Sequence, residues 1–81
     1  MNYISGFQAK EEKERAYDIH YWVIEEGENL YIRAAVEGSL VSDTVLIHTK
    51  EIREAEKTAF FLAENAVHPW HLKDILSDLN L

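Results

Sequence analysis

The most regular apolar pattern of the chain lies in residues 16–25 (AYDIHYWVIE), where side chains alternate between two sides of an extended backbone. This segment is dense in aromatic and β-branched residues, which is typical of a β-strand with one buried side. The side that we expect to face the core is uniformly apolar and consists of Tyr17, Ile19, Tyr21 and Val23.

Two further segments continue this alternation. Short turns at residues 26–29 and 38–39 introduce alternating stretches at 30–37 and 40–49. Glycine, asparagine and serine in these turns favour tight reversals of the chain. Asp43 falls on the inward side of the last stretch, which indicates a β-bulge or a later start of that strand. Three strands joined by short turns predict an antiparallel meander.

The apolar period changes from two to about 3.6 residues near position 49. Residues 50–66 form a helical repeat, with Thr49 placed to cap its start and Asn65 placed to end it. Pro69 begins a second helix, because proline is favoured at the first helical position. The expected apolar stripes are Ile52, Ala55, Ala59, Leu62, Ala63 and Ala66 in the first helix and Leu72, Ile75, Leu76 and Leu79 in the second.

These elements predict an α+β fold, a three-stranded antiparallel meander followed by two helices packed on one face of the sheet (βββαα). We expect a single domain at residues 16–81. Residues 1–15 are expected to be a loose N-terminal lead-in, because a few apolar residues precede a run of charges there.

The C-terminal segment follows a recognisable motif. Residues 67–79 (VHPWHLKDILSDL) follow the pattern V-[S/T]-P-x-H-L-x-D-V-x-x-D-hydrophobic at all positions except His68 and Ile75. Over residues 46–81 the chain resembles a family of small proteins found mainly in Clostridia and their relatives, which have no assigned activity. The resemblance implies a few strands, a helix and a terminal segment of this kind. His68 stands where the family has Ser or Thr, which are stronger helix caps.

Charge and composition exclude several classes of protein. Fifteen Asp and Glu against eight Lys and Arg give a net charge of −7, and there is no Cys among the 81 residues. Disulfide scaffolds, Cys-based zinc modules and thiol catalysis all require cysteine. The few basic residues are scattered, which disfavours direct binding of nucleic acid. With no signal peptide or apolar span, we expect a cytoplasmic protein that does not bind membranes.

Residues that carry chemistry are sparse. His68 and His71 have the spacing of two Zn²⁺ ligands across a helix start, but a third ligand has to come from elsewhere in the chain. Alternatively, His68 caps the second helix. Asp74 and Asp78 share a helix face, and paired carboxylates do acid–base work only where a cleft shifts their pKa values. We therefore predict no enzyme activity, no metal and no cofactor.

Two sets of aromatic residues are expected outside the core. Trp22, Tyr31 and Arg33 lie on the sheet face opposite the helices, and these residue types are enriched at interface hot spots. Phe61 and Trp70 point away from the buried stripes of their helices. Each set either binds a partner or packs locally: the first set across strands, the second set against one another or against the N-terminal aromatic residues.

The leading hypothesis is a small acidic protein-interaction module that acts by stoichiometric binding, as a regulator or a homodimer. The alternative is an acidic inhibitor, such as a phage-encoded anti-CRISPR-like protein, whose carboxylates compete for the basic groove of a nucleic-acid-binding enzyme. The candidate carboxylates for this alternative are Glu11, Glu12, Glu14, Glu25, Glu26 and Glu28. A metal-dependent enzyme that uses His68 and His71 is a third class.

Overall fold

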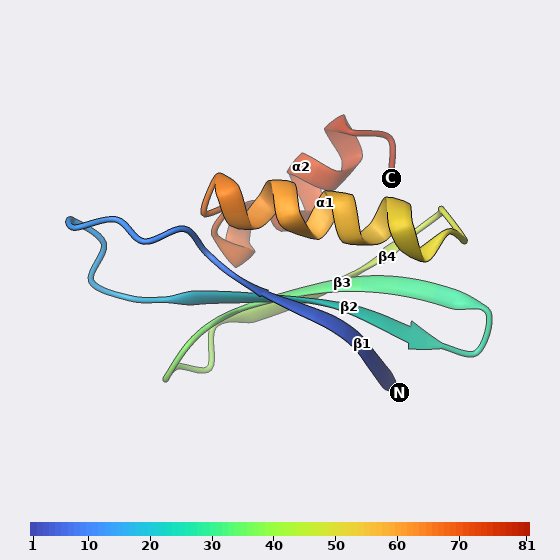
Figure 1. The fold of residues 1–81 in the computed structure, drawn as a ribbon, viewed down its shortest axis with the longest axis horizontal. Helices are drawn as coiled ribbons and strands as arrows, with labels where there is room; N and C mark the ends of the chain where they lie inside the picture. Colours follow the sequence, from blue (N-terminus) through green and yellow to red (C-terminus); the bar gives the residue numbers. More distant parts are fainter.

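The computed structural model describes residues 1–81 and shows two layers, with two helices on one face of a four-stranded sheet (Figure 1). Neighbouring strands are antiparallel and follow the order β1-β2-β3-β4. This confirms the predicted α+β class and the placement of both helices on one side. The elements are β1 (Asn2–Gln8), β2 (Ile19–Glu26), β3 (Asn29–Val36), β4 (Ser42–Ile47), α1 (Ile52–Glu64), the 3-10 turn η1 (Pro69–His71) and α2 (Leu72–Asp78).

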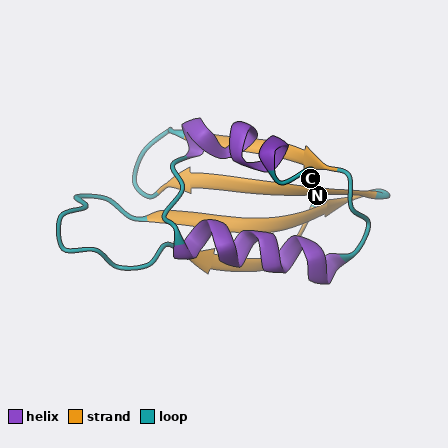
Figure 2. Ribbon diagram, turned by 90° about the horizontal axis from the view of Figure 1, so that it is seen from above, coloured by secondary structure: helices purple, strands orange, loops and turns teal.

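The predicted count of three strands is wrong, because Asn2–Gln8 form the edge strand β1. The register of β1 shifts between Tyr3 and Ser5, where one extra residue makes a bulge. The bulge breaks the alternation of side chains, and so this strand is hard to see in the sequence. Residues 9–18, which connect β1 to β2, project from one end of the molecule (Figures 1 and 2).

The core lies between the sheet and the helices. Its buried side chains are Ala9, Ile19, Tyr21, Val23, Leu30, Ile32, Ala34, Ile47, Ala55, Ala59, Leu62, Ala63, Leu72 and Leu76. The prediction that Tyr17 faces the core is wrong, because β2 begins only at Ile19 and Tyr17 is exposed. Ile52 and Leu79 are also exposed, since each lies at one end of its helix, beyond the sheet-covered part of the stripe.

Strand β4 begins later than residue 40, at Ser42, and no bulge is found at Asp43. The pairing of β3 with β4 is continuous, and Asp43 lies opposite Ala34 in an unbroken register. The Asp43 carboxylate instead accepts a hydrogen bond from the backbone N–H of Thr44, at 2.9 Å. A charged residue on the inward side of this strand is therefore accommodated by a local hydrogen bond at the sheet edge, without a change of register.

The two helices end in the same way. The N–H of Val67 donates to Leu62 O of α1, and the N–H of Leu81 donates to Leu76 O of α2. These bonds, with a residue of positive φ just after each helix, define Schellman motifs. Asn65 is the C-cap of α1, as predicted.

The prediction that Thr49 is the N-cap of α1 is wrong, because Glu51 occupies the N-cap position. The Thr49 hydroxyl accepts from the N–H of Glu51 instead, at 3.2 Å, so it organises the turn before the helix. Pro69 does begin a helical segment, but its first turn is the 3-10 turn η1.

The helices divide the sheet between them. Helix α1 lies mainly over β2 and touches β1 and β3 on either side, whereas α2 and η1 cover β4 and the adjoining part of β3 (Figure 2). Neither helix has the length and apolar character required to cross a membrane. One complete face of the sheet is left without a covering layer.

Candidate functional site

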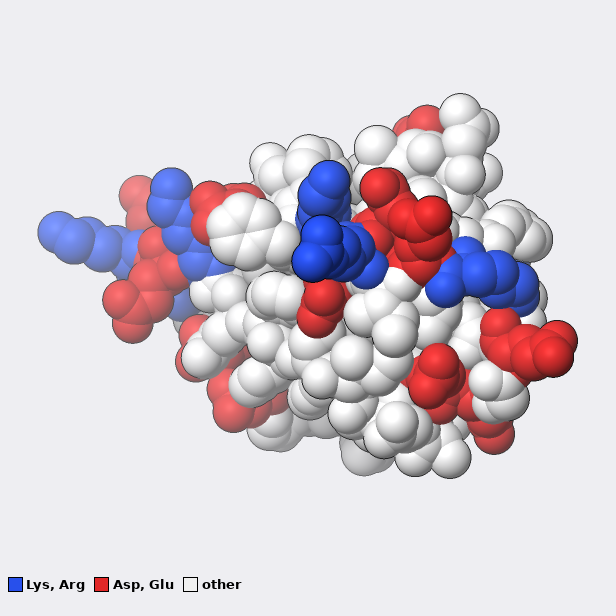
Figure 3. Space-filling model, turned by 45° about the vertical axis from the view of Figure 1, so that its right-hand side comes forward, with Lys and Arg blue, Asp and Glu red and all other residues white.

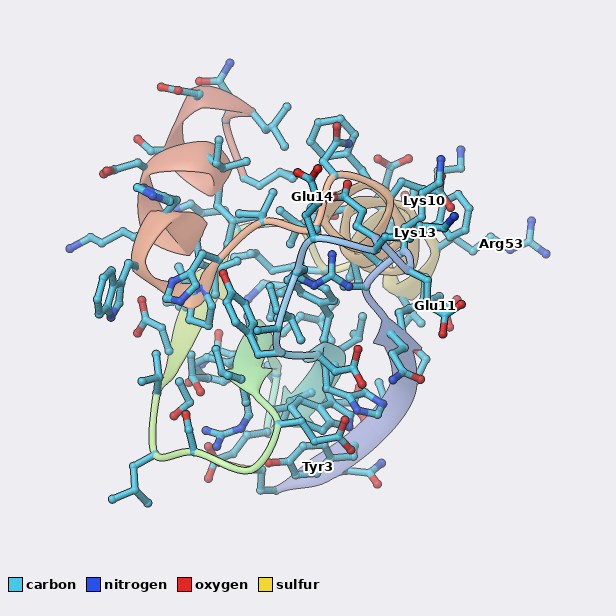
Figure 4. All side chains as sticks on the ribbon, turned by 90° about the vertical axis from the view of Figure 1, so that its left-hand side faces the viewer. Tyr3, Lys10, Glu11, Lys13, Glu14 and Arg53 are labelled. Carbon is cyan, nitrogen blue, oxygen red and sulfur yellow. The ribbon has the colours of Figure 1, made fainter.

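The sheet face opposite the helices is the candidate site, and we call it the open face. Figure 4 shows the side chain of Tyr3 below the sheet, on the side away from the helices. Cross-strand pairing then identifies the other side chains of this face, because directly paired residues point to the same side. The open face consists of Tyr3, Gly6, Gln8, His20, Trp22, Ile24, Tyr31, Arg33, Ala35, Ser42, Thr44 and Leu46. Three predicted binding residues, Trp22, Tyr31 and Arg33, are thus brought together.

Trp22 is the centre of an aromatic cluster on the open face. The ring of His20 stacks on its indole with centroids 4.9 Å apart and planes 11° from parallel. Tyr3 meets the same indole edge-on at 5.9 Å. The guanidinium carbon of Arg33 lies 5.9 Å from the indole centroid, within the range of a cation–π contact. The indole is therefore held by neighbours from three strands.

Gly6 makes room for this cluster. It lies opposite Trp22 on β1, and a Cβ atom at this position would stand 3.3 Å from Trp22 Cδ1. Such a contact is tight, so any larger residue at position 6 would have to displace the indole. The absence of a side chain lets the indole lie across β1.

The open face also buries an aliphatic side chain. Ile24 is fully buried although it points away from the helices, and its direct partners are Tyr3 on β1 and Tyr31 on β3. Apolar surface nevertheless remains exposed on this face: Tyr3 is 49% exposed and Leu46 is 43% exposed. The rings are thus fixed in place and still accessible.

Charge is depleted on the open face. Arg33 is the only charged residue of the open face, and Glu26 lies beyond it at the hairpin end, although 28% of the chain is charged. Figure 3 shows both signs of charge over the helices and the projecting loop, and an uncharged area at the lower centre of the view. Aromatic residues and arginine with few other charges are the composition of the centre of a protein interface.

Arg33 is positioned by uncharged neighbours. Its Nη1 donates to Thr44 Oγ1 at 3.3 Å, and its other close neighbour is the indole of Trp22. A guanidinium has five N–H donors. It is therefore able to donate hydrogen bonds to a carboxylate or carbonyl group of a bound molecule without first breaking an internal ion pair.

The second predicted pair, Phe61 and Trp70, does not form one surface with Trp22. Trp70 is 77% exposed in η1, and its ring packs on His68 with centroids 4.8 Å apart. Phe61 is 44% exposed on α1. The N-terminal ring that reaches α1 is Phe7, and it packs against Phe60, not against Phe61. Phe61 and Trp70 therefore stand as separate exposed residues on the helix side.

Of the two histidines, His68 has a structural role. His68 Nδ1 accepts a hydrogen bond from the N–H of Trp70 at 3.1 Å, which is the capping role considered above. The rings of His68 and His71 lie 6.5 Å apart, and no three His, Cys, Asp or Glu side chains gather at one point. Asp74 and Asp78 are exposed on α2.

The candidate carboxylates of an acidic inhibitor fall into two separate groups. Glu11, Glu12 and Glu14 lie in the projecting loop, where Lys10 and Lys13 also project (Figure 4). The other three candidates, Glu25, Glu26 and Glu28, lie at the β2–β3 hairpin, at the opposite end of the 38 Å long axis (Figure 1). The two groups do not form one continuous acidic surface.

The chemistry that the open face offers is recognition. It presents fixed aromatic planes, one guanidinium and hydroxyl groups on a broad surface. Comparisons with protein-family models, curated proteins and solved structures find no match to this chain, so the family resemblance of residues 46–81 stays a prediction. Tyr3 and Gly6 are not among the predicted site residues, because their contribution depends on the pairing of β1 with β2.

Proposed function

We propose that this protein is a non-enzymatic protein-binding module, which binds its partner stoichiometrically through the open face. The observation that supports the proposal is the cluster around Trp22 on a charge-depleted surface. Tryptophan, tyrosine and arginine dominate binding energy at protein interfaces. Because the rings are already held in place, little conformational entropy has to be lost when a partner binds.

The open face indicates the chemistry of the partner. Its exposed rings fit an apolar surface, and Arg33 fits a carboxylate or carbonyl oxygen placed among the apolar groups. Arg33 has no acidic neighbour to displace, so a partner carboxylate would form a charge-assisted hydrogen bond in a largely dehydrated setting. We therefore infer a protein partner with an apolar patch that contains an acidic residue.

Paired capture experiments test the proposal. The wild-type chain, Trp22→Ala, Arg33→Glu and the control Trp70→Ala are immobilised and exposed to extract of the native host, and the retained protein is then purified and titrated by calorimetry. We expect one partner per chain with wild type and with Trp70→Ala. Loss of a central hot spot costs about 2 kcal/mol or more, so each open-face variant should bind about 30-fold more weakly.

Arg33→Glu keeps the result interpretable if Trp22→Ala perturbs the fold, because it changes one side chain on the sheet surface. Equal binding of the partner by wild type and Arg33→Glu would contradict the proposal. Salt separates it from an acidic inhibitor, since carboxylates competing for a basic groove bind far more weakly as ionic strength rises. Binding through the open face should change little between low and physiological salt.

A further inference from the structure

The two edge strands of the sheet, β1 and β4, differ in how well they are protected against pairing with a strand of another molecule. Val36 and Val41 form a hydrogen-bonded pair between β3 and β4, in which the N–H of Val36 donates to Val41 O at 2.9 Å. From this pair onward, successive residues of β4 direct their backbone N–H and C=O groups alternately toward β3 and toward the free edge. This alternation directs the N–H of Thr44 toward the free edge, where the Asp43 carboxylate accepts it. A charged side chain that occupies an edge donor is a device that discourages pairing with another strand.

Edge strand β1 has no charged side chain of this kind, and its bulge between Tyr3 and Ser5 lies before the regularly paired stretch Ser5–Gln8. Its sequence NYISGFQ contains no charged residue. The N–H of Ala9 donates to Ile19 O at 2.8 Å, so alternation directs the backbone groups of Phe7 toward β2 and those of Gly6 and Gln8 toward the free edge. An uncharged edge with outward N–H and C=O groups is a template for another strand.

An apolar shelf lies above this edge. Because α1 is centred on β2, the helix side of β1 is only partly covered. Phe7 packs edge-on against Phe60 there, with centroids 6.4 Å apart. A shallow groove of about 420 Å³ follows this contact and is lined by Phe7, Arg53, Glu56, Lys57 and Phe60. Phe60 remains 55% exposed.

We propose that two copies of this chain form a homodimer by antiparallel pairing of their β1 strands. Gly6 of each copy lies opposite Gln8 of the second copy, which places the twofold axis beside Phe7. The two sheets then form one continuous sheet of eight strands. The two α1 helices lie antiparallel on the same face, about 14 Å apart, because three strand spacings separate β2 from β2 of the second copy.

The shelf side chains fit this spacing. Helices that pack directly lie about 8–10 Å apart, so a separation of about 14 Å leaves a strip between the two α1 helices. Phe7 and Phe60 of both copies lie along this strip. The dimer thereby covers the two apolar residues that the monomer leaves partly exposed at its β1 edge.

The charges of α1 match those of a second copy. Arg53, Lys57, Phe60 and Glu64 follow one stripe of the helix, at successive intervals of four, three and four residues. Figure 4 shows Arg53 extending from α1 on the side of β1. An axis level with the middle of this stripe brings Arg53 opposite Glu64 of the second copy. Arg53 lies near the positive N-terminal end of its helix dipole and Glu64 near the negative C-terminal end, so each charge is unfavourable in its own helix. The antiparallel helix of the second copy places an opposite charge beside each of them.

Light scattering at several concentrations tests the dimer, together with circular dichroism as a check of folding. We expect the wild type to have twice the 9.4 kDa mass of one chain and to dissociate on dilution. Gln8→Pro removes an outward N–H and should give a folded monomer, since proline is tolerated on edge strands. The matched control Ser42→Pro, which changes an outward position of β4, should remain a dimer.

Charge reversal provides a second measurement that does not depend on proline. Arg53→Glu changes two symmetry-related ion pairs and should weaken dimerisation about tenfold, and the double variant Arg53→Glu, Glu64→Arg should restore it. A wild type that is monomeric at about 100 μM would overturn the proposal. A dimer that withstands Gln8→Pro and is lost with Arg33→Glu would also overturn it, because that dimer would use the open face. Failure here leaves the proposed function standing, since the dimer uses the backbone edge and the helix side of β1, whereas partner binding uses the cluster around Trp22.

Discussion

At the scale of single residues, Tyr21 connects the sheet to the segment between the helices. It is fully buried on β2, and its hydroxyl donates a hydrogen bond to Val67 O at 2.7 Å. Burial raises the pKa of Tyr21 above its ordinary value, while the nearby positive charge of Arg15 opposes this shift. The folded state therefore holds the phenol proton more strongly than the unfolded state does.

Tyr21→Phe tests this role through the pH dependence of stability. At neutral pH the variant should lose about 1–2 kcal/mol, because Val67 O is left without its donor. Both states keep the Tyr21 proton below about pH 10, and above it the unfolded state loses this proton first. Wild-type stability should therefore fall more steeply with pH above about 10 than that of Tyr21→Phe. Urea unfolding between pH 7 and 11 measures this, and parallel curves would exclude the raised pKa.

At the scale of elements, both helices are followed by a residue in the left-handed conformation, but the two residues differ in how well they tolerate it. Ala66 follows α1 with φ of 46°, whereas Asn80 follows α2 with φ of 60°. An L-residue with a Cβ atom pays for this conformation unless, like asparagine, its side chain tolerates it. The end of α1 is therefore held in place by its Schellman hydrogen bonds at the expense of local strain.

Ala66→Gly should relieve this strain. We expect a gain of about 0.5–1 kcal/mol in the free energy of unfolding, after the larger entropy of an unfolded glycine has been subtracted. Thermal or urea unfolding measures the gain. Asn80→Gly is the matched control and should change stability less, because asparagine already suits the position. A loss of stability in Ala66→Gly would show that the conformation at residue 66 is not strained.

The elements also show what the sequence was able to predict. Alternation identified β2, β3 and β4, and the turns between them contain Gly27 and Gly38 with φ of 61° and 77°, as tight reversals require. The 3.6-residue period identified both helices. Strand β1 was missed because its bulge interrupts the alternation, and because its pairing with β2 bridges a loop of ten residues that carries no strand signal.

The candidate site was predictable to the same extent. Trp22, Tyr31 and Arg33 were placed on one face because each lies at a known phase of an alternating strand. The contact of Tyr3 with Trp22 depends on pairing between distant segments, which no local pattern specifies. Phe7 likewise packs on Phe60 only because β1 and α1 lie side by side. Long-range pairing thus decides which aromatic residues cluster.

At the scale of the whole molecule, the two proposed surfaces are compatible. The open face is opposite the helices, and the β1 edge lies along one side of the sheet. A twofold axis perpendicular to the sheet leaves both helix layers on one side and both open faces on the other. The dimer would therefore present two binding faces in the same direction, each with its own Trp22 and Arg33.

This arrangement predicts bivalent binding. In solution, each Gln8→Pro chain should bind one partner with an affinity within about a few-fold of that of wild type, because Gln8 lies at the β1 margin of the open face, opposite His20, where contacts contribute little binding energy. On a surface densely coated with partner, the wild-type dimer should dissociate about 100-fold more slowly than Gln8→Pro, since rebinding of one half becomes intramolecular. Surface plasmon resonance at high and low partner density measures this difference. Equal dissociation at high density would mean that the two open faces do not act together.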